Sequence, residues 1–198
     1  MNEHYYTPAP QSMSDERRFE LEFEGEKYSF IYDNGVFSKG RLDDGTRILL
    51  SAVETVSGDV LDLGCGWGPV GTILARRFPA ARILMTDVNE RALGLSEKNL
   101  KLNRVENART LASDGFTNIE GCFDCILTNP PIRAGKQTIY GMFDDALHHL
   151  KPDGALYIVI RRQQGAESAL KYLEKANAQV ILRDKGYWVI RCGREGAQ

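Results

Sequence analysis

The 198-residue chain lacks the marks of membrane proteins, secreted proteins and general nucleic-acid coats. No apolar run approaches the roughly 18 residues that cross a bilayer, and no signal-peptide pattern is present. Cysteines number only four, and the formal net charge is −2. These absences predict a protein of the reducing cytoplasm without membrane contact. They also exclude a strong basic field, so any contact with nucleic acid must be local.

A complete metal site is missing as well. Cys122 and Cys125 have CxxC spacing, but no second pair or histidine cluster completes a zinc site. The pair also enters an apolar stretch that is typical of a strand. We therefore expect incidental or structural thiols and no metal.

The composition is that of one globular domain, with 42% hydrophobic and 26% charged residues. The sequence contains no internal repeat and no low-complexity segment. We expect a single domain over residues 1–198. Its expected parts are an extended arm (1–16), a β-hairpin (17–33), a loop and helix (34–58) and a Rossmann-like core (59–198).

Local patterns predict the hairpin and the first helix. Residues 18–23 and 27–32 alternate apolar and polar side chains around a Glu-Gly-Glu turn, the period of a hairpin with one buried face. Residues 42–56 have helical spacing, and Asp43 or Asp44 is suited to the N-cap position.

From residue 59 onward, predicted strands alternate with predicted helices. The expected strands are 60–63, 82–87, 108–111, 123–128, 155–160, 179–183 and 187–191. The expected helices are 69–78, one capped by Asn89 and running to about 102, one that closes at 147–150 before a turn at 151–154, and 167–176. This alternation predicts an α/β fold with a doubly wound, mostly parallel seven-stranded sheet whose last strand is antiparallel.

A glycine-rich loop follows the first core strand, where residues 62–68 read DLGCGWG. Ligands of open α/β sheets bind beyond the carboxyl ends of the strands, and glycines let the backbone approach them. The carboxylate of Asp62 suits a cationic cofactor better than the pyrophosphate of a dinucleotide. A dinucleotide fold nevertheless stays open here, because residues 66–71 also satisfy GxGxxG and Asp87 would bind ribose in either case.

A second motif, Asn129-Pro130-Pro131-Ile132, follows the strand expected at 123–128. Its two prolines fix φ and remove two N–H donors, so the loop presents acceptors in a rigid array. An aromatic NH2 group is a poor nucleophile because its lone pair is delocalised into the ring. Hydrogen bonds from that group to the carbonyls of Asn129 and Pro130 would draw the nitrogen toward tetrahedral geometry. The alternative is a plain turn after a strand.

Together the two motifs resemble those of class I S-adenosylmethionine-dependent methyltransferases that modify exocyclic or amide nitrogens. With residues 4–7, 35–38 and 42–50, the resemblance narrows to the bacterial small-subunit rRNA guanine-N2 methyltransferases, the ribosomal small subunit methyltransferase C family, in single-domain form. It implies S-adenosylmethionine as cofactor, the N2 amine of a guanine in 16S rRNA as methyl acceptor, and ribosomal RNA or the small subunit as partner.

The resemblance also assigns roles to residues. Asp62, Gly64 and Gly66 would hold the methionine end of the cofactor, Asp87 the ribose, Asp114 the adenine, and Asn129 with Pro130 the target amine. Phe37 lies in a loop that closes over the methionine moiety in such enzymes. Cys65, Val88, Gly115 and Phe116 are expected beside the cofactor, although 113–116 could also be a plain Asp-Gly turn. The cations expected near the RNA, unless they are ordinary solvated charges, are Arg133, Lys136, Arg161 and Arg162.

Two alternatives come from other function classes. The first is a protein glutamine-N5 or DNA adenine-N6 methyltransferase, since both use Asn-Pro-Pro. Those enzymes usually have an aromatic residue next, whereas this chain has Ile132, which counts modestly against both. The second is a non-catalytic RNA-binding protein with a methyltransferase fold, which the presence of Asp62, Asp87 and Asn129 disfavours.

Overall fold

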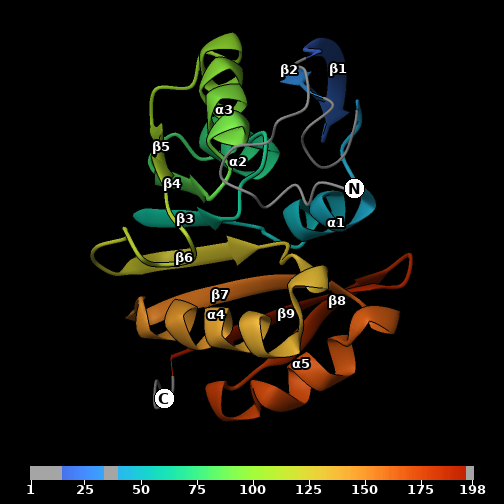
Figure 1. Ribbon diagram of the computed structural model, residues 1–198, viewed down its shortest axis with the longest axis vertical. Coiled ribbons are helices and arrows are strands. Elements are labelled where there is room, and N and C mark those ends of the chain that lie inside the picture. Colours follow the sequence, from blue (N-terminus) through green and yellow to red (C-terminus); the bar gives the residue numbers. More distant parts are fainter. Residues whose placement is uncertain (1–14, 34–39, 195–198) are drawn as a thin grey trace.

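A seven-stranded sheet forms the middle of the molecule in the computed structural model, which describes residues 15–33 and 40–194 (Figure 1). The strand order is β5-β4-β3-β6-β7-β9-β8. The strands are β3 (Asp59–Leu63), β4 (Arg82–Asp87), β5 (Ala108–Ala112), β6 (Phe123–Thr128), β7 (Leu150–Arg161), β8 (Gln179–Asp184) and β9 (Tyr187–Gly193). β3 to β7 pair in parallel, and β9 is antiparallel to both of its neighbours, which confirms the predicted sheet.

Helices cover both faces of this sheet. The α-helices are α1 (Asp44–Ser51), α2 (Pro69–Arg77), α3 (Glu90–Leu102), α4 (Lys136–His148) and α5 (Ala166–Tyr172), with short 3-10 turns η1 (Ile132–Ala134), η2 (Arg162–Gln164) and η3 (Glu174–Ala176). α1, α2 and α3 pack on one face, and α4 and α5 pack on the other (Figure 1). Strand side chains alternate between the two cores: Val60 faces α1–α3, whereas Leu61 faces α4 and α5.

The predicted N-terminal hairpin is confirmed as a separate two-stranded sheet of β1 (Arg17–Phe23) and β2 (Glu26–Tyr32). It packs on the α1–α3 face. The rings of Phe19 and Phe30 meet the buried Trp67 edge to face, with centroids 5.6 Å and 4.9 Å away. The hairpin is therefore anchored to the glycine-rich loop that follows β3.

Two expected local features are wrong, and a third is split into two helical segments. The helix expected over 42–56 spans only Asp44–Ser51. Val53 and Val56 are buried too, but they lie in a segment that is neither helix nor strand, so their apolar spacing was not that of a helix. The turn expected at 151–154 is instead part of β7, which starts at Leu150 and pairs with β6 through a register shift. The helix expected over 167–176 is α5 followed by η3, which ends before Asn177 in a left-handed conformation.

Within the described residues, no helix is long and apolar enough to cross a membrane. All four cysteines fall in the described ranges and are free. The same ranges contain no cluster of three or more metal-ligating side chains. The expected arm at 1–16 lies outside the described residues up to residue 14, and so do all of residues 34–39 at the start of the expected loop.

Candidate active site

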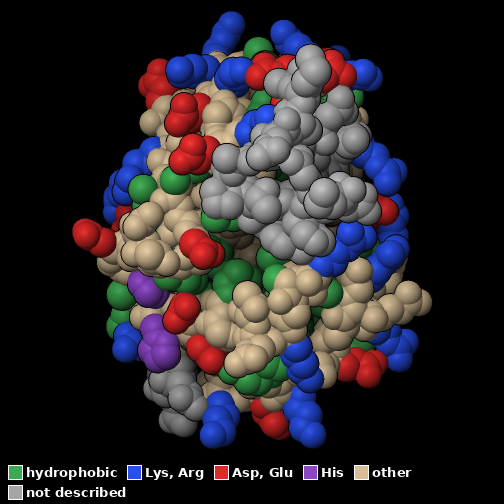
Figure 2. All heavy atoms as spheres, in the orientation of Figure 1, with side chains coloured by type: hydrophobic (Ala, Val, Ile, Leu, Met, Phe, Trp, Pro, Cys, Tyr) green, Lys and Arg blue, Asp and Glu red, His purple; other side chains and the backbone are tan. Residues whose placement is uncertain are grey.

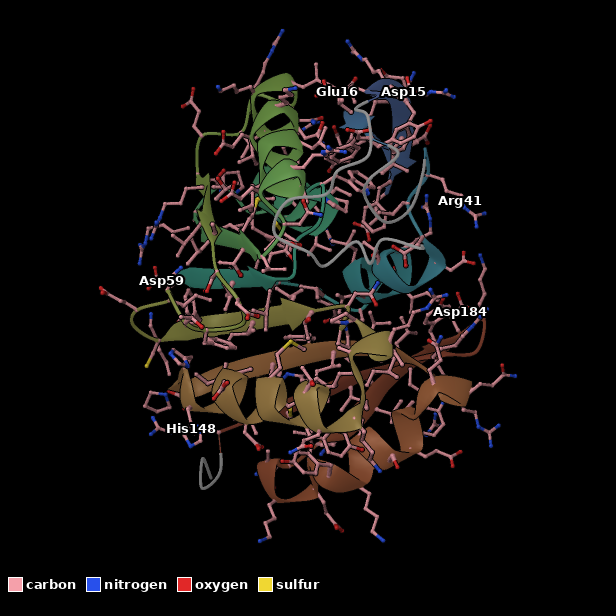
Figure 3. The ribbon with its side chains drawn as sticks, viewed as in Figure 1. Asp15, Glu16, Arg41, Asp59, His148 and Asp184 are labelled. Atoms are coloured by element: carbon pink, nitrogen blue, oxygen red, sulfur yellow. The ribbon has the colours of Figure 1, made fainter. Side chains whose placement is uncertain are left out.

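Three loops meet at the carboxyl edge of the sheet. Leu63 at the end of β3 pairs with Thr86 of β4 on one side and with Thr128 of β6 on the other. The residues that follow these three in the sequence are Gly64, Asp87 and Asn129. Asp87 therefore lies on one side of the glycine-rich loop and Asn129 on the other. Figure 3 helps to locate this edge: Asp59 begins β3 on one side, and Asp184 ends β8 on the opposite side. The predicted meeting of the two motifs is thus part of the fold.

The glycines of the loop fall into two kinds. Gly64 and Gly66 have φ of +75° and +57°, and a Cβ built on either would meet nothing within 4 Å. A Cβ on Gly68 would lie 2.6 Å from Met85, and one on Gly71 would lie 2.5 Å from the same side chain. Gly68 and Gly71 therefore serve the packing of α2 on β4, whereas Gly64 and Gly66 leave an open backbone surface that a ligand can approach.

The amides of this loop are used within the protein. The N–H groups of Gly64 and Cys65 donate to the Thr86 carbonyl at 2.9 and 2.8 Å, and the N–H of Gly66 donates to Asp87 Oδ2 at 2.8 Å. The first turn of α2 already has a carboxyl partner within the protein, because Gly71 N–H donates to Asp62 Oδ2 at 2.8 Å. A dinucleotide loop needs such amides for the pyrophosphate. This arrangement disfavours the dinucleotide alternative.

Two carboxylates lie under the loop in a low-dielectric setting. Asp62 is only 3% exposed, and burial, with a smaller contribution from the neighbouring Asp87, raises its pKa to about 7. Burial also raises the pKa of Asp87, against the effect of backbone N–H groups that donate to it. Among the described residues, no cation contributes to the pKa shift of either carboxylate. A positively charged ligand would compensate these charges, so a sulfonium cofactor fits this site.

The side-chain amide of Asn129 has a defined orientation. Its Nδ2 lies 3.3 Å from Asp43 Oδ1 and 3.2 Å from Thr46 Oγ1, both at the start of α1. Because a carboxylate can only accept hydrogen bonds, the NH2 end must face α1. No described residue donates to Asn129 Oδ1, so this oxygen can accept from another group.

The other residues of the Asn-Pro-Pro motif shape the same loop. The Pro131 carbonyl accepts from Ala134 N at 2.8 Å inside the turn that starts η1. The Pro130 carbonyl accepts no such bond from the described residues. Pro130 is buried, and Ile132 is half-buried against the α4 face. The side-chain carbonyl of Asn129 and the backbone carbonyl of Pro130 are therefore two acceptors that this loop can offer to a ligand.

The remaining residues predicted for the cofactor lie in different settings. Cys65 is buried, and burial raises the pKa of its thiol well above its usual value, so the thiol is not a ready nucleophile. Val88 is half-buried beside Asp87, and Asp114 is exposed. The ring of Phe116 stacks on His149 with centroids 4.5 Å apart, so one of its faces is already covered. Gly115 has φ of +54°, and Phe37 lies outside the described residues.

The four predicted RNA-contacting cations are all exposed, on two segments. Lys136 donates to Ser168 Oγ at 3.1 Å, and Arg162 pairs with Glu167 at 3.0 Å. The guanidinium of Arg161 lies 5.2 Å from the ring centre of Tyr187. Figure 2 shows basic side chains scattered among acidic ones over the visible face, without a single basic field.

Sequence reasoning missed the polar residues that hold the glycine loop from α3. Ser96 Oγ donates to the Gly66 carbonyl at 2.8 Å, and Asn99 Nδ2 donates to the Trp67 carbonyl at 2.8 Å. Both side chains are fully buried on the apolar face of α3. Buried polar side chains need hydrogen-bond partners. Two polar residues three positions apart on the apolar face of a predicted helix were therefore the signal available in the sequence.

The open glycine loop can be tested with Gly64→Ala. Alanine at φ of +75° costs about 1–2 kcal/mol of stability. Its methyl group also enters the space that a ligand would use, so we expect S-adenosylmethionine affinity to fall at least about tenfold, a loss comparable to about 1.4 kcal/mol of binding. Calorimetric titration measures this loss. Gly25→Ala is the matched control, since Gly25 has φ of +81° and equally open surroundings in the β1–β2 turn, and it should lose stability alone. Equal affinities of the two variants would contradict a ligand role for Gly64.

The sheet with an antiparallel β9, the open glycine loop over the buried Asp62 and the half-buried Asp87, and the Asn-Pro-Pro loop beside it define a class I S-adenosylmethionine-dependent methyltransferase. Comparison with known proteins makes the assignment narrower. Residues 27–191 match the family model of the methyltransferase small domain, and the chain belongs to that family.

Relatives with similar sequences include an uncharacterized protein, YbxB of Bacillus subtilis strain 168, which is 42% identical over 197 residues, 96% of this chain and 98% of that protein. The ribosomal RNA small subunit methyltransferase C of Mannheimia succiniciproducens is 44% identical over 130 residues. That match covers 63% of this chain but 39% of the relative.

Among solved structures, the fold is similar to the T. thermophilus 16S rRNA N2 G1207 methyltransferase RsmC in complex with AdoMet and guanosine. The TM-score is 0.77 at 27% identity, and the match covers 93% of this chain and 52% of that one. The chain thus spans well under two thirds of these named methyltransferases. The comparisons confirm the predicted class, family and cofactor.

Proposed function

We propose that this methyltransferase transfers a methyl group to the exocyclic N2 amine of a guanine in 16S rRNA. The observation that carries the proposal is the orientation of the Asn129 amide, whose NH2 is held by α1 and whose oxygen is left as an acceptor. A planar aromatic amine offers two N–H donors to such a site. Support comes from the relatives named for rRNA methylation and from the similar structure that holds AdoMet and guanosine.

In this proposal the chain positions the amine and changes its geometry. The carbonyls of Asn129 and Pro130 each accept one N–H of the guanine amine. These bonds draw the nitrogen toward tetrahedral geometry, so that its lone pair is less delocalised into the ring and can attack the methyl group. S-adenosylmethionine, when bound, supplies a methyl group on a positively charged sulfur. The methylated amine then releases one proton to water.

The cofactor residues are proposed on the same basis. Gly64 and Gly66 offer their open backbone to the methionine end, with Asp62 beneath it as a compensating carboxylate. Asp87 would bind the ribose hydroxyls and Asp114 the adenine amine. Cys65, Val88, Gly115, Phe116 and Phe37 complete the proposed cofactor surroundings, and Pro131 and Ile132 complete the substrate loop.

A transfer assay with several acceptors tests the proposal. Labelled S-adenosylmethionine is incubated with unmodified small ribosomal subunits, naked 16S rRNA, duplex DNA and protein, and the products are analysed by nucleoside mass. We expect N2-methylguanosine in the subunit or the rRNA only. Label in N6-methyladenine of DNA or in protein glutamine would assign the same loop to the alternative chemistry. No transfer to any acceptor, with intact cofactor binding, would favour a non-catalytic protein.

The proposed RNA-facing cations give a separate prediction. Arg161 ends β7 at the carboxyl edge and Arg162 begins η2, beside the proposed substrate loop, and we propose that both contact phosphates together with Arg133 and Lys136. We expect the double variant Arg161→Ala/Arg162→Ala to raise KM for RNA about tenfold and to weaken the salt dependence of binding. Affinity for S-adenosylmethionine should not change.

Lys101→Ala provides the control for this variant, because Lys101 is an exposed cation in the last turn of α3, away from the substrate loop. Binding of RNA is measured at several salt concentrations. An unchanged salt slope in the double variant, or an equal loss in Lys101→Ala, would leave these arginines as ordinary surface charges.

A further inference from the structure

Asn129 depends for its orientation on a residue far away in the sequence. Asp43 Oδ1 accepts from Asn129 Nδ2 at 3.3 Å and from Thr46 N at 3.0 Å. The same oxygen therefore caps α1 and holds the amide that follows β6. Thr46 Oγ1, 3.2 Å from Nδ2, lies on the second side of the amide. Figure 1 shows α1 beside the chain segment that leaves β6.

The start of α1 is a fixed support for this contact. Thr46 is 5% exposed, and Leu49 and Leu50 on the same helix are fully buried. A Cβ on Gly45 would lie 3.0 Å from the ring of Tyr187, so the helix approaches β9 as closely as a glycine allows. Asp44 faces elsewhere, with Lys185 Nζ 3.0 Å from its Oδ1. The two neighbouring aspartates thus serve different contacts, and only Asp43 reaches the proposed substrate loop.

We infer that Asp43 is a positioning residue for methyl transfer, which acts through Asn129 and rests on the proposed function. The carboxylate excludes the flipped amide, because a flipped Asn129 would turn its oxygen toward Asp43 and its NH2 toward the amine of the substrate. It also polarises the amide, since a negative charge beside the NH2 increases the electron density on Oδ1. Both effects make Oδ1 a better acceptor for a substrate N–H. Thr46 Oγ1 accepts from the same NH2 group, but a hydroxyl could also donate to a flipped amide oxygen, so Asp43 alone selects the orientation.

Asp43→Asn tests this inference while the helix cap is retained, because asparagine is as good an N-cap as aspartate. The introduced asparagine lacks the charge and can face Asn129 with either end of its amide. We expect kcat to fall about tenfold or more, with the affinity for S-adenosylmethionine and the melting temperature close to wild type. Asp44→Asn is the matched control, since it removes the neighbouring carboxylate of the same helix start, and it should keep wild-type kcat.

A double-variant cycle shows whether Asp43 acts through Asn129. In the Asn129→Ala background, whose residual rate is measured over long incubations, Asp43→Asn should cause no further loss. The side-chain NH2 resonances of Asn129, identified by their absence in Asn129→Ala, should shift in Asp43→Asn and not in Asp44→Asn. Unchanged resonances, a weaker cofactor affinity or an additive loss would overturn the positioning role.

The outcomes separate this inference from the proposed function. If Asn129→Ala turns over as fast as wild type, or no guanine is methylated, the proposed function fails first. If Asn129→Ala is inactive and Asp43→Asn is fully active, the proposed function stands and the positioning role alone is wrong.

Discussion

Asn129→Ala should lower kcat by about 10²-fold or more while the affinity for S-adenosylmethionine changes less than about twofold. Loss of one preorganised hydrogen-bonding group in an active site typically costs about 10²–10³ in rate. Here the alanine removes the oxygen that α1 directs away from itself, and the amine is left with a single acceptor on the Pro130 carbonyl. Single-turnover kinetics separate the chemical step from binding.

Asn129→Asp sharpens the same test. The aspartate keeps two acceptor oxygens but loses the NH2 group, and its charge is repelled by Asp43. It should be nearly as inactive as the alanine variant if orientation matters. Gln179→Ala removes an exposed amide at the amino end of β8 and should keep wild-type kcat. Wild-type turnover in Asn129→Ala would contradict the proposed role of this residue.

Much of this fold could be predicted from the sequence because its signals are local. β4 and β6 coincide with the expected strands, since each is a short apolar run bounded by turn or loop residues. The caps of α1 and α3 were also readable, because Asp43 and Asn89 precede their helices and accept from the third residue beyond. The predicted end of α1 was wrong because tertiary packing, and not a helical face, buries Val53 beyond it.

The candidate site was predictable as a set of motifs but not as a network. Sheet pairing brings Asp87 and Asn129 to the two sides of the glycine loop. The expected parallel sheet implied that these residues share its carboxyl edge, but not which strands are neighbours. The contact of Asn129 with α1 joins residues 86 positions apart, and no local pattern carries such a pairing. Asp43 was readable as a helix cap, and its second partner follows only from the tertiary structure.

Asp62→Asn should make the protein more stable at pH 8 and almost unchanged in stability at pH 4. The pKa of the Asp62 carboxyl is raised to about 7 by burial, from an ordinary value of 3.8. Between these values the folded state binds more protons than the unfolded state, so the contribution of Asp62 to the free energy of unfolding falls as the pH rises through this window. Above about pH 7 the penalty is complete, and it amounts to about 4 kcal/mol at most.

Asp59→Asn on the same strand is a control of opposite sign. Hydrogen bonds and charge from Lys151 and Arg82 lower the pKa of Asp59. Its contribution to stability is present above the ordinary value and is lost as the pH falls, so this variant should be less stable than wild type at pH 8. Chemical unfolding at several pH values measures both differences. If Asp62→Asn were destabilised at pH 8 as Asp59→Asn is, the buried carboxylate would not carry the proposed penalty.

Asp62→Asn should also weaken cofactor binding about tenfold or more. The gain in stability and the loss of affinity are opposed, and a role in binding would explain why a destabilising carboxylate lies under the loop. A bound sulfonium favours the charged form of Asp62, so binding near pH 6.5 should release protons. Calorimetry in buffers of different ionisation enthalpy measures that release. It should be smaller for S-adenosylhomocysteine, which lacks the positive charge on sulfur, and smaller for Asp62→Asn. Equal proton release for both ligands and both proteins would place the charge compensation elsewhere in the site.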